Sequence, residues 1–392
     1  DGRAILLGEQ LTPDGHRVDI QLKGSGRTRF SRGGDGRAAL GPMLREHLIG
    51  EAMHELGIPT TRSLAVATTG EAVRRETPLP GAILTRVASS HLRVGTFEYA
   101  GARQDPALLR ALADYTIERH APECADTETP HLGLLDRVIE GQAALIARWM
   151  LVGFVHGVMN TDNAALSGET IDYGPCAFLD TYDPNTVFSS IDHHGRYAYG
   201  QQPVIGQWNM ARFAETLLPL IDPTPEVAVE HAQASIERFV DRYEHHWLAG
   251  MKAKLGWVTD EPDDAERIAH FLGILQERRG DFTNTFRALT AGTLDEQPAF
   301  AEWLTDWRQR IARQPIESAE VTALQERHNP AVIPRNHLVE AALDAAWQDG
   351  DLGPFEQLSD ALRDPYDHRR ERADVQRPAP ADSPPYRTFG GT

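Results

Sequence analysis

Asn163 and Asp172 are the two side chains of this sequence best suited to holding a metal ion together with a nucleotide. Asn163 closes the stretch HGVMNTDN, and Asp172 opens an Asp-Tyr-Gly tripeptide shortly afterwards. Mg²⁺ on a nucleotide triphosphate takes one or two carboxylate or amide oxygens from the protein, while phosphates and water supply the rest. A turn at Gly168-Glu169 predicts a small hairpin that brings both side chains together. Protein kinases pair an Asn with the Asp of a D-F-G turn in this way, although an isolated Asp-Tyr-Gly is more often a simple turn.

The candidate general base is Asp162, because the spacing of a kinase catalytic loop is not kept. A kinase places its catalytic Asp two residues after the His, whereas His156 is followed by Gly157 and Val158. Asp162 is the nearest acid. It could accept the proton of an attacking hydroxyl or only cap the hairpin, and the sequence leaves both roles open.

A second kinase-like element is formed by Lys23, at the end of a predicted strand, and Glu46, on the predicted helix that follows. In a kinase such a pair positions the lysine on the phosphates. Many surface Lys and Glu residues would satisfy the same description, so this interpretation depends on the metal motif. Arg86 and Arg93 could also donate paired hydrogen bonds to phosphate oxygens, although a single Arg is more often a surface residue.

The stretch from Lys23 to Gly41 is rich in glycine, and its backbone amides could hold phosphate oxygens. It has neither the GK[ST] ending of a P-loop nor GxGxxG spacing, so a flexible surface loop is an equal alternative. A local basic patch within a chain of formal net charge −18 favours an anionic ligand. The patch consists of Arg27, Arg29, Arg32 and Arg37.

The elements that must position these residues change from strands to helices along the chain. The first ninety or so residues predict a sheet with one helix packed on it. The predicted strands are 4–11, 18–23, 63–69, 72–75 and 82–87, broken by Gly70 and by residues 78–81, and the predicted helix is 40–56. Later helical patterns cover 106–119, 132–154, 225–255, 263–277 and 338–348, and a Pro- and Gly-rich arm, 373–392, ends the chain.

Composition narrows the possible partners. The 392 residues, 41% of them hydrophobic, can bury the cores of about two or three domains. The excess of acidic over basic residues argues against a nucleic acid partner. No apolar run approaches the ~20 residues that span a bilayer. Two cysteines without CxxC spacing, Cys124 and Cys176, favour a reducing, cytoplasmic compartment. The chain opens on Asp1 without an initiator Met, so we expect an upstream part. The histidine pairs His193-His194 and His245-His246 are expected to have structural roles.

Five blocks of the sequence together resemble the selenoprotein O family of protein adenylyltransferases, also called the YdiU family. The blocks are QLKGSGRTRFSRGGDGRAALGPMLREHLIGEAMHELGIPTTRSLAV, PGAILTRVASSHLRVGTFEYA, HGVMNTDNAALSGETIDYGPCAFLDTYDP, DHHGRYAYGQQPVIGQWNMARFAETLLPL and NPAVIPRNHLVEAAL. The resemblance implies an α+β, protein-kinase-like fold of two lobes, in which ATP binds in a flipped orientation and AMP is transferred to Ser, Thr or Tyr hydroxyls of proteins. We expect a β-rich N-lobe at 1–104, a helical C-lobe at 105–260, a helical extension at 261–372 and the tail at 373–392.

The resemblance also implies roles for individual residues. Asp162 falls on the family's proton acceptor, and Asn163 and Asp172 fall on its ligands for Mg²⁺ or Mn²⁺. The implied contacts to ATP are made by Gly2, Arg3, Lys23, Asp35, Gly36, Arg86, Arg93 and Asp172, and Glu46 is the implied ion-pair partner of Lys23. Two cysteine positions of the family correspond to Phe188 and Gly390, so we expect no redox disulfide there.

Two other functions share these contacts. An ATP-dependent phosphotransferase differs only in which phosphorus faces the acceptor. A non-catalytic ATP-binding scaffold, or pseudokinase, has little need for both metal ligands, so the presence of Asn163 and Asp172 weighs against it.

Overall fold

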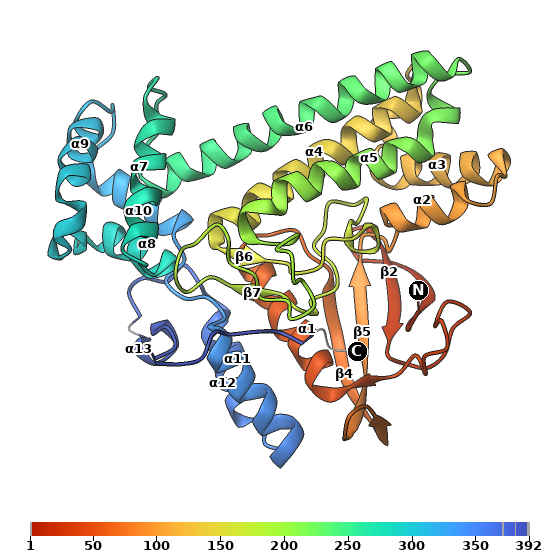
Figure 1. Cartoon of the computed structure of the whole chain (residues 1–392), viewed down its shortest axis with the longest axis horizontal. Helices are drawn as coiled ribbons and strands as arrows, with labels where there is room; N and C mark the ends of the chain where they lie inside the picture. Colours follow the sequence, from red (N-terminus) through yellow and green to blue (C-terminus); the bar gives the residue numbers. More distant parts are fainter. Residues whose placement is uncertain (1, 371, 381, 390–392) are drawn as a thin grey trace.

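A computed structural model of the chain describes residues 2–370, 372–380 and 382–389. The predicted α+β class is confirmed: an antiparallel sheet lies beside a larger helical part (Figure 1). The strands are β1 (Ala4–Leu11), β2 (Arg17–Lys23), β3 (Ala38–Ala39), β4 (Arg62–Arg74), β5 (Pro78–Ala88), β6 (Phe154–Val155) and β7 (Ala177–Phe178).

The main sheet has the order β1-β2-β5-β3, and β4 pairs with the other side of β5. The predicted hairpin of β1 and β2 is confirmed, with a turn closed by a 2.8 Å bond from the Thr12 amide to the His16 carbonyl. β2 pairs with β5 so that Lys23 lies opposite Leu84 and Gln21 lies opposite Arg86. This register brings the predicted Lys and Arg onto neighbouring strands.

The predicted break at residues 78–81 is wrong, because Pro78 and Pro80 lie inside β5. Likewise 63–69 and 72–75 are one strand, β4, with a register irregularity between Thr68 and Ala72. β2 reaches residues 84–88 of β5 and β3 reaches Gly81 and Ala82, so residues 78–80 have β4 on one side and no paired strand of the described chain on the other. A proline is tolerated at such an edge because it has no amide to leave unpaired.

Thirteen α-helices are assigned within the described residues. Their bounds are α1 (Leu40–Glu55), α2 (Val94–Gly101), α3 (Pro106–His120), α4 (Pro130–Val152), α5 (Gln202–Ile221), α6 (Pro225–Lys254), α7 (Asp264–Glu277), α8 (Phe282–Ala291), α9 (Ala301–Ala312), α10 (Ser318–His328), α11 (Asn336–Asp344), α12 (Gly353–Leu362) and α13 (Ala373–Gln376). The predicted helices at 40–56, 106–119, 132–154, 225–255 and 263–277 are confirmed to within a few residues. The one at 338–348 ends as a π-helical turn, Ala345–Asp349.

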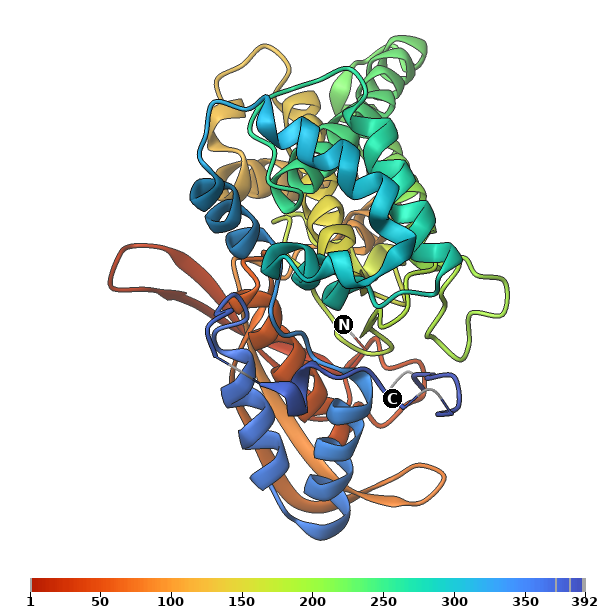
Figure 2. The ribbon, with the colours of Figure 1, turned by 90° about the vertical axis from the view of Figure 1, so that its left-hand side faces the viewer.

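Most of the helices fall into three groups (Figures 1 and 2). The long helices α4, α5 and α6 pack on one another, and α7 to α10 gather near the far end of α6. The chain then returns to the sheet, where α11 and α12 pack against α1. One buried apolar cluster runs through all three groups. No helix in the described part of the chain is both long and apolar enough to cross a membrane.

The described part of the tail is docked on the body of the protein. The Thr388 amide donates to the Phe188 carbonyl at 2.8 Å, and its hydroxyl donates to the Pro175 carbonyl at 2.8 Å. The Tyr386 hydroxyl donates to Glu340 on α11 at 2.6 Å. Phe188 is thus beside the tail, and Gly390 lies outside the described residues.

Candidate active site

Four charged side chains from β2, α1, β5 and the Asp-Tyr-Gly turn form one cluster at the centre of the candidate site. Lys23 is ion-paired with both Glu46 and Asp172. Arg86 also reaches both: its Nε donates to Glu46 at 2.8 Å and one terminal nitrogen donates to Asp172 at 3.0 Å. The predicted Lys23–Glu46 pair is present, and it is buried rather than on the surface, with 5% and 3% of the side chains exposed.

The charges of the cluster balance as two cations and two carboxylates. Burial opposes ionisation of Glu46, but Arg86 and Lys23 outweigh it and lower the pKa of that carboxyl. Burial alone would raise the pKa of Asp172, but the positive charges of Lys23 and Arg86 outweigh this effect and hold the pKa well below its usual range. Both carboxylates are therefore ionised at neutral pH, and Asp172 keeps 29% of its side chain exposed.

The backbone of Asp172 adopts φ +70°, a left-handed conformation that is rare outside glycine and that clusters at functional sites. Two neighbours hold it. His156, fully buried, lies 2.9 Å by its Nε2 from the Ile171 carbonyl, and its Nδ1 accepts from the Val158 amide. These partners require Nε2–H, and burial lowers the pKa of His156, so the ring is neutral. The Tyr173 hydroxyl forms a hydrogen bond with the Thr60 hydroxyl, and this bond anchors the residue that follows Asp172 in the turn.

The predicted hairpin between Asn163 and Asp172 is wrong as a self-paired unit. Its first arm pairs with the segment after β5: Val94 and Ala164 share a 3.0 Å backbone bond, and Arg93 bridges to Ala165. Its second arm pairs elsewhere, since Thr170 bridges to Thr60 beside α1. Each arm finds a partner distant in sequence, and the turn at Gly168, with φ +77°, is all that remains of the hairpin.

This pairing brings Arg93, Asp162 and Asn163 to one place. Arg93 donates to the Asp162 carbonyl at 3.1 Å, and burial lowers the pKa of Arg93 without making it neutral. Asn163 donates its amide nitrogen to the Val158 carbonyl at 2.8 Å, which leaves its oxygen as the atom that could bind a metal. No group of three or more His, Cys, Asp or Glu suited to a metal occurs among the described residues.

The glycine-rich stretch folds back along the end of β2. The Gly24 amide donates to the Arg3 carbonyl at 2.7 Å, and Ser31 donates to the Gly2 carbonyl at 2.5 Å. Gly36 has φ +68° and lies so close to the Gly26 carbonyl that a Cβ would overlap it. Asp35 does not face the cluster in this structure: it is half-exposed and ion-paired with Arg75 at 3.0 Å.

Two cavities flank the charged cluster. The first, of about 190 Å³, lies between the cluster and the tail. Among its lining residues are Arg3, Lys23, Asp172, Trp347 and Arg387. The second, of about 570 Å³, lies beneath β1 and β2, and its lining includes Gln21, Arg27, Arg29, His91, Arg93 and Tyr115. Gln21 connects this second cavity to the cluster, since its side-chain oxygen accepts from Arg86 at 3.2 Å.

Of the predicted basic patch, Arg27 and Arg29 line the second cavity, whereas Arg37 pairs with Glu71 at 2.5 Å. Two further residues of the site, His91 and Arg45, were not predicted from the sequence. Arg45 is a buried arginine of α1 that donates to the Gly174 and Cys176 carbonyls at 3.2 and 2.8 Å. An Arg one position before the predicted Glu46 was the available signal for Arg45, and proximity to Arg93 was the signal for His91.

Comparison with known proteins defines the class of this enzyme. The chain is 59% identical, over 397 aligned residues, to the protein nucleotidyltransferase YdiU of Geobacillus kaustophilus (strain HTA426), with 100% of this chain and 82% of the relative covered. It is 60% identical to the protein of the same name from Alkaliphilus metalliredigens (strain QYMF), with 100% and 81% covered. The protein is a nucleotidyltransferase, so a nucleotide is among its substrates.

Residues 1–363 also match the family described as protein adenylyltransferase SelO. The chain therefore belongs to the SelO family, and the resemblance noted in its sequence blocks is confirmed.

Proposed function

We propose that this protein transfers AMP from ATP to Ser, Thr or Tyr hydroxyls of other proteins, in a kinase-like cleft where the triphosphate is flipped. In this proposal residues 1–104, with β1 to β5, α1 and α2, form the N-lobe, and residues 105–260, with α3 to α6, form the C-lobe. The observation that carries the proposal is the second cavity. Its lining carries three arginines, Arg27, Arg29 and Arg93, whose guanidinium groups could bind a polyphosphate, beside apolar side chains such as Ile5, Leu6 and Phe30.

The cluster connects that cavity to the proposed point of reaction. In this proposal the terminal phosphate lies in the second cavity, Arg86 and Lys23 lie along the triphosphate, and the α-phosphorus lies beside Asp162 and Asn163. Arg86 and Lys23 are already charged and held in place by Glu46, so they would stabilise the growing charge of the leaving pyrophosphate without reorganising.

In the proposed reaction the acceptor hydroxyl attacks the α-phosphorus, and a new P–O bond forms there. The bond between the α-phosphorus and the oxygen that bridges to the β-phosphorus breaks, and pyrophosphate leaves with that electron pair. The hydroxyl proton passes to the Asp162 carboxylate. Asp162 belongs to a short 3₁₀ turn, Thr161–Asn163, which is fixed by the bond from Thr161 to Glu98 at 2.5 Å.

A divalent cation fits the residues present. The Asn163 side-chain oxygen and the Asp172 carboxylate are hard oxygen ligands, and two protein ligands together with phosphates and water are what Mg²⁺ commonly takes. Mg²⁺ or Mn²⁺ bound there would neutralise charge on the reacting phosphates. Asp172 would then exchange part of its interaction with Lys23 and Arg86 for the metal.

Label transfer tests the proposal. The protein is incubated with Mg²⁺ or Mn²⁺, candidate protein acceptors and ATP labelled at the α- or, separately, the γ-phosphate. We expect protein-bound α-label that disappears in Asp172→Ala and falls at least about 100-fold in Asp162→Asn, as for loss of a general base. Protein-bound γ-label alone would mean phosphoryl transfer instead, and ATP binding without either label would leave the scaffold function.

A further inference from the structure

His91 is a histidine whose ring is buried and whose Nε2 atom has no hydrogen-bond partner within the described chain. Only 6% of its side chain is exposed, and its other nitrogen, Nδ1, faces the Asp19 carboxylate at 3.5 Å. Leaving such a group unpaired is costly, so unpaired buried polar atoms in a native fold call for a ligand, water or ion. His91 lines the second cavity together with Arg27, Arg29 and Arg93.

We propose that His91 binds the terminal phosphate of the nucleotide, and therefore the pyrophosphate that leaves, through its Nε2 atom. This inference rests on the proposed function, because it assigns the terminal phosphate to the second cavity. It adds a specificity-determining residue to the three arginines of that cavity.

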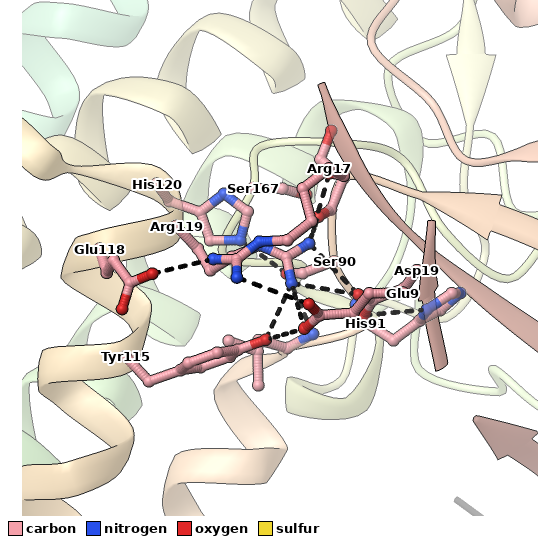
Figure 3. A network of polar contacts seen from close by, with 12 residues as sticks. Glu9, Arg17, Asp19, Ser90, His91, Tyr115, Glu118, Arg119, His120 and Ser167 are labelled. Carbon is pink, nitrogen blue, oxygen red and sulfur yellow. Dashed lines mark hydrogen bonds and ion pairs between the residues drawn. The ribbon is translucent and has the colours of Figure 1, made fainter. Parts of the chain in front are cut away.

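The position of the ring relative to Asp19 indicates which nitrogen remains for the ligand. Asp19, on β2, accepts from the His91 amide at 2.9 Å, and its carboxylate lies 3.5 Å from His91 Nδ1 (Figure 3). Arg119 on α3 holds the same carboxylate by bonds of 3.2 Å. Because a carboxylate only accepts, the nitrogen facing it carries the proton, and Nε2 is left for the cavity.

A neighbouring histidine shows what a purely structural role looks like. His120, on α3, lies in the same network, but its Nε2 is 2.7 Å from the Ser90 hydroxyl and it does not line the second cavity (Figure 3). The Nε2 atom of His120 thus has a partner, whereas the Nε2 atom of His91 has none.

The charges around His91 imply that a proton binds together with the phosphate. Burial lowers the pKa of His91, while Asp19 opposes this and Arg86 and Arg93 add to it, so the ring is neutral before the ligand arrives. The charged and titratable groups on the surrounding elements are Glu9 on β1, Asp19 on β2, Arg86 on β5, Arg93 before α2, Tyr115 and Arg119 on α3, and Arg27 and Arg29 in the glycine-rich stretch.

A neutral ring with its proton on Nδ1 turns a lone pair toward the phosphate, and two lone pairs repel. One additional proton, on Nε2 or on the phosphate oxygen that meets it, converts this repulsion into a charge-assisted hydrogen bond. Phosphate monoesters have their second pKa near 6, and the terminal phosphate of a nucleotide titrates in a similar range, whereas an inner phosphate does not. The arrangement therefore selects for a terminal phosphate.

Calorimetric titration with magnesium pyrophosphate, ATP and AMP tests this assignment. The variants are His91→Leu, which removes both nitrogens, His91→Gln, which can restore one donor, and the control His120→Gln. We expect His91→Leu to bind pyrophosphate and ATP about 10- to 100-fold more weakly than the unmodified protein, with AMP affinity unchanged. His91→Gln should recover part of the loss, and His120→Gln should match the unmodified protein.

Repeating the pyrophosphate titration in buffers of different ionisation enthalpy gives the protons taken up. The unmodified protein should take up more protons per pyrophosphate than His91→Leu. The assignment is overturned if His91→Leu keeps its pyrophosphate affinity, or if it loses AMP and pyrophosphate by the same factor, as a general packing defect would. If the unmodified protein transfers α-label but His91→Leu keeps its pyrophosphate affinity, this inference alone is refuted. If the unmodified protein binds neither ATP nor pyrophosphate, the proposed function is refuted as well.

Discussion

Gly95, in the first turn of α2, lies directly against the carboxylate of Asp162. A Cβ placed on Gly95 would overlap the Asp162 Oδ1 atom, far inside any real carbon–oxygen contact. The backbone there is not left-handed, so Gly95 is not needed for its conformational freedom. The space that its missing side chain leaves is occupied by the candidate general base, and α2 thereby limits where Asp162 can lie.

The Gly95→Ala substitution should therefore separate activity from stability. In a helix, alanine is favoured over glycine by up to about 1 kcal/mol, so the fold should lose little or nothing. Asp162 must move to admit the methyl group, and we expect AMP transfer to fall by roughly 10- to 100-fold, as for a misplaced reacting group. Initial rates of α-label transfer and a thermal melt measure the two effects. Gly101→Ala is the matched control on the same helix, because its Cβ would meet Thr216 only at an ordinary 3.9 Å.

Glu46→Gln should destabilise the protein and change its response to acid. The substitution leaves Lys23 and Arg86 buried with Asp172 as their one remaining carboxylate in the cluster, and breaking a buried pair costs about 3–5 kcal/mol. Because the pKa of Glu46 is lower in the folded chain than in the unfolded chain, its stabilisation is present above about pH 4.5 and is lost as the pH falls through the folded value.

Urea unfolding between pH 7 and pH 3 measures this contribution. The free energy of unfolding of the unmodified protein should fall more steeply toward acid than that of Glu46→Gln. Asp35→Asn is the control, since Asp35 pairs with Arg75 in a half-exposed position and an exposed pair contributes about 0–1 kcal/mol. Equal slopes for the unmodified protein and Glu46→Gln would contradict the charge balance assigned to the cluster.

The sequence predicts well those parts of the site that depend on local pattern. The β1–β2 hairpin and α1 follow from a Pro-Asp-Gly turn and from apolar spacing, and they bring Lys23 opposite Glu46. Arg86 is a candidate phosphate ligand from the sequence as well, and the sheet register places it beside the same carboxylates.

The sequence does not predict contacts that are decided by distant segments. Ala164–Asp172 reads as a hairpin because its two arms are short and flank a turn, but each arm gains more by pairing with Arg93 or Thr60. The residue pattern of one segment does not show which distant segments have unpaired backbone groups with which it can form hydrogen bonds. The docking of Tyr386 on Glu340 is hidden for the same reason, since the composition of the tail leaves open whether the arm is loose or docked.

Lys254→Met should stabilise the protein at neutral pH. Lys254 ends α6 fully buried, with its Nζ 4.1 Å from the centre of the Phe286 ring and 3.4 Å from the His328 carbonyl. Burial lowers the pKa of this amine to about 7. Since the unfolded chain binds the proton more tightly, the free energy of unfolding should rise with pH between about 7 and 10, by on the order of 2–4 kcal/mol in total.

In Lys254→Met this rise should disappear, and the gain over the unmodified protein should be greatest at and below pH 7. Chemical unfolding at pH 6.5, 8 and 9.5 provides the comparison. Lys252→Met is the control, because Lys252 pairs with the exposed Asp260 and its substitution should leave the pH dependence in place. A protein whose stability is flat over this range would show that Lys254 is charged in the folded state.

Thiol reagents should leave the native protein unmodified and active. Both cysteines, Cys124 and Cys176, are free and buried, and burial raises the pKa of Cys176 to about 11, so its reactive thiolate is scarce. Phe188 accepts a hydrogen bond from the Thr388 amide of the tail through its backbone carbonyl. We therefore expect α-label transfer to be equal, within about twofold, in dithiothreitol and in mild oxidant. Ellman's reagent should react with the thiols only after unfolding, and rapid labelling of the folded protein with loss of activity would contradict the burial of Cys176 beneath the Asp-Tyr-Gly turn.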